Sequence, residues 1–266
     1  MTSVKVSIGL IALFGAIVCI LTLTATAQVE PISSESQAAM EKRIQQLETR
    51  LERMEDRAAI EKLTRAFNYY GDHGLWGNVV ELFADDSRVE ISGRGAYHGK
   101  KGVERLFLKA IGKGKIGLPD GMMANHMTIQ GIVDVAADGK TAKGRWREFS
   151  TYGFHENERA LWGAGTLAIE YVKEEGIWKF KDLQFFVNFM ADYNDGWGKA
   201  PRYGSTLSQE YPPDDPPLEY DRYPGRYVVP FHYPNPVSGK VWTLEDTERH
   251  STKGMSPEPS SNVIQD

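Results

Sequence analysis

The most regular hydrophobic pattern in the chain starts at residue 40. In "MEKRIQQLETRLERMEDRAAIEKL" apolar residues recur at alternating spacings of four and three, with Glu, Lys, Arg and Gln between them. This is the heptad pattern of a coiled coil, although it covers fewer than three full repeats. The apolar positions, called the heptad seam below, are Met40, Ile44, Leu47, Leu51, Met54 and Ala58. We expect residues 28–56 to form a helical extension that either assembles subunits or lies against its own domain, and we favour assembly.

The helical pattern continues through "AAIEKLTRAFNYY", and the glycines Gly71 and Gly74 are expected to end it. "WGNVVELFADDS" then predicts a short second helix. "RVEISG" predicts a strand, and "VERLFLKAIGKG" predicts a third helix after the turn "YHGKKG".

The second half of the chain has the alternating pattern of β-strands. "NHMTIQGIVDV" and "TAKGRWREFSTYGF" flank the turn "AADGK", while "ALWGAGTLAIEYV" and "IWKFKDLQFFVNF" flank "KEEG". Each pair is typical of a β-hairpin. Three helices followed by a four-stranded antiparallel meander, with one earlier strand, predict an α+β domain over residues 57–195.

The N-terminal residues 1–27 have the organisation of a targeting signal. A lysine precedes the apolar run "VSIGLIALFGAIVCILTLT", and "ATAQ" supplies small residues for cleavage. The run is long, so this segment is either a signal peptide or an uncleaved membrane anchor. In both cases we expect a bacterial protein whose body is periplasmic or secreted, with a membrane partner only if the segment stays attached.

The C-terminal part, residues 196–250, changes character. It is rich in Pro and Tyr and has no helical or strand period, yet it is too aromatic for a typical disordered linker. We expect an irregular arm that packs across its own domain or a neighbouring subunit. Residues 251–266 are expected to be disordered.

The net charge, the cysteine content and the absence of known motifs exclude several classes of function. The net charge of −5 gives no basic surface for nucleic acid. The one cysteine, Cys19, falls in the N-terminal apolar segment, so a processed chain has no thiol nucleophile or thiolate ligand. No phosphate-binding, dinucleotide-binding, serine-hydrolase or zinc-protease motif is present, and no two histidines are spaced as metal ligands. We therefore expect a site made of side chains, with no cofactor and no metal.

Asp72 is the first candidate for chemistry. It stands where a helix ends, so it is either a surface carboxylate or a desolvated one. Tyr70 precedes it and Trp76 follows it, and such an aromatic setting would raise its pKa and make it a competent base or an orienter of histidine. The adjacent His73 is expected to be a surface residue.

Two strands supply further candidates. His126 begins a strand and shares a face with Thr128 and Gln130. The next strand presents Trp146, Glu148, Ser150 and Tyr152 on one face, a set that would be costly to bury without a purpose. The alternative is a solvated or intersubunit face.

The order of these patterns resembles a known family. "AIEKLTRAF…D…W…LFADDSRVEI", "YHGKKGVERLF", "NHMTIQGIVDVAADGKTAKGRW" and "GIWKFKDL" are similar to the SnoaL-like and scytalone dehydratase-like families of the nuclear transport factor two superfamily. The resemblance covers residues 57–193. It implies a cone-shaped fold in which a strongly bent antiparallel sheet wraps around N-terminal helices and encloses a pocket.

The resemblance also implies a site. Scytalone dehydratase-like proteins carry an aspartate four residues before a tryptophan, matched by Asp72, and a partner histidine, matched by His126. A second histidine of that site falls at Tyr152 here, a tyrosine beside the aspartate becomes Gly71, and a first-strand tyrosine becomes Ile91. The residues expected to be catalytic are Asp72, His126 and Tyr152, and those expected to bind substrate are Tyr70, Trp76, Trp146 and Glu148.

The expected function follows from the same resemblance. Some bacterial relatives are cofactor-independent lyases that remove formaldehyde from lignin-derived biaryls. We expect a lyase that performs retro-aldol deformylation or dehydration of a hydroxylated aromatic small molecule. The alternatives are an isomerase and a non-catalytic binding protein for a small hydrophobic ligand. A homo-oligomer, dimer or trimer, is expected.

Overall fold

The structure is a computed structural model that describes residues 33–91, 93–199 and 207–253. The expected signal peptide with Cys19 lies outside the described residues, as does the tail from residue 254 onward. Within the described ranges, no helix has the length and apolar character needed to cross a membrane. The chain divides into two compact units, Met1–Glu48 and Thr49–Asp266.

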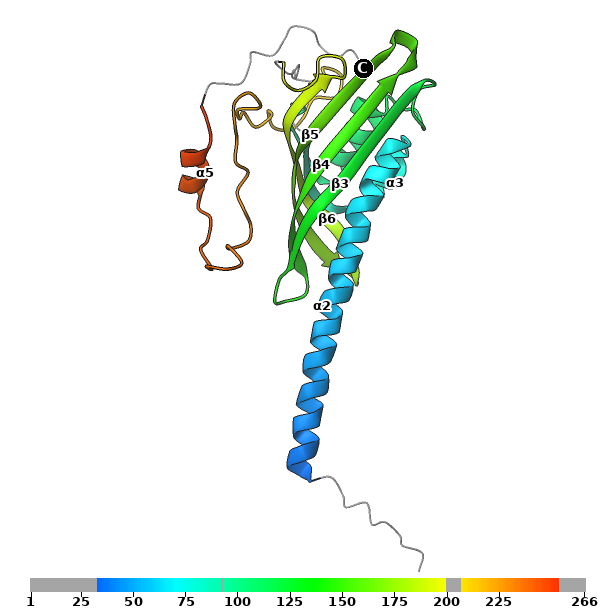
Figure 1. Cartoon of the computed structure of the whole chain (residues 1–266). Helices are drawn as coiled ribbons and strands as arrows, with labels where there is room; N and C mark the ends of the chain where they lie inside the picture. Colours follow the sequence, from blue (N-terminus) through cyan, green and yellow to red (C-terminus); the bar gives the residue numbers. More distant parts are fainter. Residues whose placement is uncertain (1–32, 92, 200–206, 254–266) are drawn as a thin grey trace, which may run out of the picture. The chain divides into compact units, whose positions relative to one another are not determined.

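The long helix α2 begins the described chain, and the four long strands β3 to β6 follow the shorter elements (Figure 1). The helices are α2 (Ser34–Asp72), α3 (Trp76–Glu81), α4 (Gly99–Glu104), the π-helical segment η1 (Arg105–Ile111), the single 3₁₀ turn η2 (His155–Asn157) and α5 (Leu244–His250). The strands are β1 (Phe83–Ile91), β2 (Ala96–His98), β3 (Met122–Val135), β4 (Thr141–Phe154), β5 (Arg159–Glu174) and β6 (Ile177–Asp192).

All six strands form one curved, open sheet in the order β2-β1-β6-β5-β4-β3, so the expected α+β class is confirmed. The meander from β3 to β6 is antiparallel, as predicted. β1, however, pairs with β6 in parallel, so the sheet is mixed and not wholly antiparallel. The reason is the connection through β2, α4 and η1, which carries the chain to the far edge before the meander returns toward β1.

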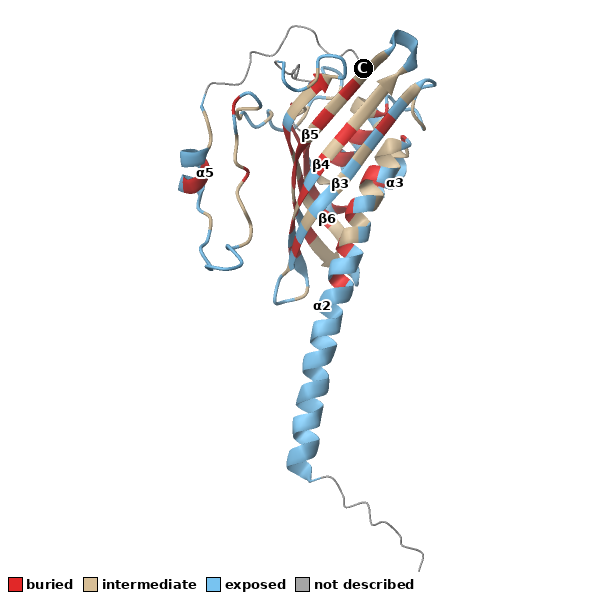
Figure 2. Cartoon of the chain, in the orientation of Figure 1, coloured by how far each residue is buried: buried red, intermediate tan, exposed pale blue. Residues whose placement is uncertain are grey.

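The second half of α2 lies on one face of the sheet, called the inner face below. Its buried residues are spaced by four, which places them on one side of the helix: Asp56, Ile60, Thr64 and Asn68. The Thr64 hydroxyl is 2.8 Å from the Tyr171 hydroxyl, and the Asp56 carboxylate accepts hydrogen bonds from Lys173 (2.7 Å) and Trp178 (2.8 Å). Figure 2 shows the change along α2 from an exposed first half to this partly buried second half.

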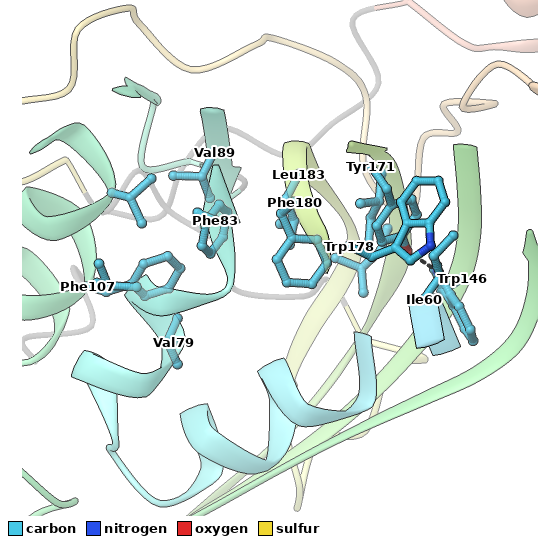
Figure 3. Packing of buried hydrophobic residues seen from close by; sticks show 14 of the residues in the cluster. Ile60, Val79, Phe83, Val89, Phe107, Trp146, Tyr171, Trp178, Phe180 and Leu183 are labelled. Carbon is cyan, nitrogen blue, oxygen red and sulfur yellow. Dashed lines mark hydrogen bonds between the residues drawn. The ribbon is translucent and has the colours of Figure 1, made fainter. Parts of the chain in front are cut away.

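Aromatic rings fill the space between α2, α3 and the inner face (Figure 3). Phe67 of α2 contacts the rings of Phe83, Phe107 and Phe180 at centroid distances of 5.6–6.2 Å. Such edge-to-face contacts each add roughly 0.5–1.5 kcal/mol beyond the burial of area. This cluster fixes the last turns of α2, and with them Asp72, relative to the sheet.

In the described residues, the C-terminal arm packs on its own domain, which is one of the two expected arrangements. The Arg145 side chain of β4 donates to the carbonyl oxygens of Val229 (3.0 Å) and Pro230 (3.1 Å). Phe186 of β6 contacts the rings of Tyr220 and Tyr227 at 5.5 and 5.6 Å. The arm therefore covers part of the outer face of the sheet, opposite α2.

Two details of the arm differ from the prediction. It contains α5, whose start is capped because Thr243 and Asp246 exchange side-chain and backbone hydrogen bonds. This helix has only seven residues, too few to produce a visible helical period. Thr252, which falls in the segment expected to be disordered, has a defined contact, because its N–H donates to the carbonyl of Arg226 (2.8 Å). The rest of that segment, from residue 254, lies outside the described residues.

Gly74 is the position where the end of α2 depends on glycine. Its φ is +65°, and an added Cβ would lie 2.4 Å from the backbone carbon of Gly117. We expect Gly74→Ala to lower the free energy of unfolding by about 1–2 kcal/mol or more. Alanine is strained in the left-handed backbone conformation, and its Cβ would clash with the backbone of Gly117.

Gly71→Ala is the matched control. Gly71 lies inside α2 with no atom within 4 Å of an added Cβ, so alanine should raise stability by up to about 1 kcal/mol. Urea denaturation of both variants measures the difference. Equal effects of the two substitutions would contradict this account of the helix end.

Candidate active site

Asp72 is the last residue of α2, and the backbone around it forms a tight C-terminal cap. The N–H of Leu75 donates to the carbonyl of Tyr70 (2.9 Å), and that of Gly74 donates to Gly71 (3.0 Å). A carboxylate at this end faces the negative pole of the helix dipole, which costs roughly 0.3–1 kcal/mol. Asp72 therefore needs donors from another element.

His126 of β3 supplies those donors. Its ring nitrogen Nδ1 is 2.5 Å from Oδ1 of Asp72, and its backbone N–H lies 3.0 and 3.2 Å from the two carboxylate oxygens. The side chains are 11% exposed for Asp72 and 23% exposed for His126. The structure thus brings together the aspartate and the histidine that the sequence analysis had paired across 54 positions.

Tyr152 of β4 contacts the other side of the His126 ring. Its hydroxyl is 2.8 Å from Nε2, and the two rings meet edge to face at 5.3 Å. An ionised carboxylate only accepts hydrogen bonds, so Asp72 assigns the donor role to Nδ1–H. Nε2 of the neutral ring is then the lone-pair nitrogen that accepts from Tyr152. The three residues form one hydrogen-bonded line.

Strand register explains why these side chains share one face. His126 lies opposite Ser150, and Glu148 and Tyr152 flank Ser150 on β4. Side chains at opposite positions, and at positions two residues away on the partner strand, point to the same face of an antiparallel pair. Glu148 is 3% exposed and Ser150 is 1% exposed, so a polar set is buried on the inner face.

Asn68, one turn before Asp72, links this polar set to α2. Its side-chain amide donates to the carbonyl oxygen of His126 (3.3 Å) and to the hydroxyl of Thr128. It also forms a hydrogen bond with the Glu148 carboxylate. The sequence analysis missed Asn68, although its spacing of four from Asp72 on one helix was a readable signal.

The pKa values of His126 and Glu148 both depend on the charged groups around them. Burial by itself lowers the pKa of His126, but the hydrogen bond to Asp72 and the negative charges of Glu148 and Asp72 outweigh burial, so the pKa is raised. Burial raises the pKa of Glu148, and the charge of His126 and the hydrogen bond from Asn68 offset part of that effect. The surrounding negative charges therefore make the His126 imidazole a stronger base than a histidine in water.

The other residues predicted to bind substrate, Tyr70, Trp76 and Trp146, pack in or against the hydrophobic core. Tyr70 and Trp76 are partly buried against the hydrophobic core, and Trp76 stacks on Phe107 at 6.4 Å. Trp146 lies within the core, where its indole N–H donates to the Tyr171 hydroxyl (3.0 Å) and its ring covers Gly131. His73 is exposed, as expected. In the described ranges, no group of three or more His, Cys, Asp or Glu side chains is arranged to hold a metal ion.

A family model described as a SnoaL-like domain matches residues 52–184, which is half of the chain and contains every residue of the hydrogen-bonded line. The chain belongs to the SnoaL-like domain family. No curated protein sequence matches it. The second half of α2, strands β1 to β5 and the first half of β6 lie inside the matched SnoaL-like region.

Several solved structures are similar to the SnoaL-like part of the chain. A putative scytalone dehydratase from Novosphingobium aromaticivorans is 20% identical with a TM-score of 0.46, covering 55% of this chain and 91% of that one. A hexachlorocyclohexane dehydrochlorinase, LinA-type3, from Novosphingobium barchaimii is 21% identical with a TM-score of 0.46, covering 53% and 92%. At these identities and scores, neither likeness carries information about the chemistry of this chain.

The raised pKa of His126 is testable by following its imidazole resonances in nuclear magnetic resonance spectra. We expect a pKa above the ordinary value of 6.5, and a lower pKa in Glu148→Gln, because the variant removes a neighbouring negative charge. The His126 contribution to the free energy of unfolding should be fully present below pH 6.5 and lost as the pH rises through the folded pKa.

Glu170→Gln is the matched control, since Glu170 is a half-exposed carboxylate on β5 that pairs with Lys143. It should leave the pKa of His126 unchanged. A wild-type pKa at or below 6.5, or an equal response to both substitutions, would show that the Glu148 charge does not act on the ring.

Proposed function

We propose that the protein is a lyase or dehydratase that uses Asp72, His126 and Tyr152 for acid–base chemistry and needs no cofactor. The observation that carries the proposal is the hydrogen-bonded line from the Asp72 carboxylate through the His126 ring to the Tyr152 hydroxyl. A carboxylate, a histidine and a hydroxyl in this order form a unit that accepts a proton at one end and stabilises the resulting charge at the other.

Each residue has a distinct role. Asp72 holds the ring in the orientation that leaves Nε2 as the basic nitrogen, and it stabilises the imidazolium once a proton arrives. His126 takes the proton from the substrate, either directly or through the Tyr152 hydroxyl, which passes its own proton to Nε2. When His126 takes the proton directly, the Tyr152 hydroxyl turns its single proton from Nε2 to the oxygen on which negative charge develops.

Both candidate reactions need one proton taken and one proton returned. In a dehydration, the base removes a proton from carbon, the electron pair forms the new double bond, and the leaving hydroxyl departs as water after protonation. In a retro-aldol deformylation, the base removes the hydroxyl proton, the carbon–carbon bond breaks to release formaldehyde, and the resulting carbanion is protonated. Neither reaction changes the oxidation state of the protein, and the imidazolium supplies the returned proton.

We assign a hydroxylated aromatic molecule as the substrate class, with a lignin-derived biaryl as the leading candidate. The support is the resemblance to lyases of such compounds, together with the aromatic side chains of Tyr70 and Trp76 on either side of Asp72. The leader expected at residues 1–27 would place this activity outside the cytoplasm, where fragments of a plant polymer arise.

The proposal is tested by screening the purified protein against aromatic diols for formaldehyde release or for a rise in absorbance from a conjugated product. With a substrate in hand, Asp72→Asn, His126→Ala and Tyr152→Phe should each lower kcat by roughly 10²–10⁴-fold, because each removes one part of the proton path.

His73→Ala is the matched control, because this exposed histidine is adjacent to Asp72 in the chain and its ring lies 3.1 Å from the Tyr69 carbonyl oxygen, away from the hydrogen-bonded line. It should keep full turnover. Thermal unfolding separates a loss of chemistry from a loss of fold. The proposal is wrong if Asp72→Asn and His126→Ala fold normally and retain wild-type kcat, and recovery of a tightly bound, unchanged ligand would favour a binding protein.

A further inference from the structure

The first half of α2 carries the heptad seam on a surface that the described residues leave open. Its large apolar side chains are between 46% and 70% exposed: Met40, Ile44, Leu47, Leu51 and Met54. Figure 2 shows this part of the helix exposed along its length. A row of apolar side chains on a solvated helix is a surface that another protein segment can cover.

The 4–3 spacing fixes the heptad positions. Ile44, Leu51 and Ala58 occupy position a, while Met40, Leu47 and Met54 occupy position d. The apolar positions a and d also determine which residues occupy the flanking positions e and g. All three g positions are arginine, namely Arg43, Arg50 and Arg57, and all three e positions are glutamate, namely Glu41, Glu48 and Glu55.

Because every g position is positive and every e position is negative, the charges favour a second copy of this helix as the partner and a parallel orientation of the two helices. In a parallel, in-register pair of helices, a g residue meets the e residue five positions later on the partner, so Arg43 would meet Glu48 and Arg50 would meet Glu55 of a second copy. In an antiparallel pair, g meets g and e meets e, which would place arginine against arginine and glutamate against glutamate. A second copy of this helix therefore pairs Arg43, Glu48, Arg50 and Glu55 with opposite charges only when parallel. The two flanking residues at the ends of the seam, Glu41 and Arg57, would face Ser36 and Lys62.

One pair of apolar positions favours two strands. A β-branched residue at a and leucine at d favour two-stranded coils, and Ile44 and Leu47 are such a pair near the start of the seam, while Leu51 and Ala58 occupy the other a positions. The side chains of Arg43, Glu48, Arg50 and Glu55 are all exposed and lie beside the apolar row, where they can reach a partner helix.

We propose that residues 40–58 of α2 dimerise the protein as a parallel, in-register, two-stranded coiled coil with a second copy of this chain. The occupant of the seam is thus the same helix of another molecule. This inference is independent of the proposed chemistry, because it uses no residue of the Asp72–His126–Tyr152 line.

Charge reversal with rescue tests the partner and the pairing. One variant combines Arg43→Glu with Arg50→Glu, and the other combines Glu48→Arg with Glu55→Arg. Each alone should raise the dimer dissociation constant by roughly tenfold or more in sedimentation equilibrium, because four attractive contacts become repulsive. An equal mixture of the two variants should recover the wild-type affinity as a heterodimer, since the opposite charges then face each other again.

Cysteine trapping tests the direction. In a Cys19→Ser background, Met40→Cys should form a disulfide with Met40→Cys of a second copy, and Ala58→Cys with Ala58→Cys. A parallel arrangement predicts no mixed product between the two variants. An antiparallel arrangement, which places a positions against d positions, predicts mainly the mixed product between residues 40 and 58. Both positions lie outside the candidate site, so circular dichroism and unfolding temperature should stay as in the Cys19→Ser protein.

The proposal is overturned if the full chain sediments as a single chain at all concentrations, or as a trimer or larger assembly. It is also overturned if the charge-reversal variants associate as tightly as the wild type, if their mixture fails to regain affinity, or if residue 40 cross-links to residue 58. The proposal is supported if the protein has the mass of two chains, if the charge-reversal variants weaken this dimer, and if disulfides form between identical positions of the two copies.

Discussion

The contact between the Asp72 carboxylate and His126 is the interaction on which the site depends. It joins the last residue of α2 to the first half of strand β3 and uses one backbone and one side-chain N–H of the same residue. A carboxylate at a helix C-terminus is unfavourable on its own, so the two elements stabilise each other's ends. The same contact determines which nitrogen of the ring is basic and turns that nitrogen toward Tyr152.

The position of Asp72 is set by a row of residues along α2. Asp56, Thr64 and Asn68 each hydrogen-bond a residue of the sheet, and Ile60 fills the space between them. Their spacing of four residues makes one face of the helix follow the curvature of the inner face. The aromatic cluster around Phe67 then holds the neighbouring face. Because both sets are anchored, the end of the helix is placed within hydrogen-bonding distance of β3.

Much of this organisation was readable in the sequence. Alternation predicted the four long strands, the glycines predicted the end of α2, and the resemblance correctly paired Asp72 with His126. The parallel pairing of β1 with β6 was not predictable, because it depends on where the connection through α4 and η1 delivers the chain. Strand alternation placed Trp146 on the same face as Glu148, but it could not show that a glycine at position 131 lets the indole settle into the core. Asn68 escaped notice because an amide in mid-helix has no motif, and its role appears only with its partners on β3 and β4.

The central claim is that Asp72 fixes His126 in the state with a proton on Nδ1 and a lone pair on Nε2. The most direct measurement is the ¹⁵N chemical shifts of the His126 ring at a pH above its pKa, where the imidazole is neutral. The account predicts a protonated-type shift for Nδ1 and an unprotonated-type shift for Nε2, and it predicts that Asp72→Asn weakens this preference. A neutral ring that carries its proton on Nε2 in the wild-type protein would contradict the account.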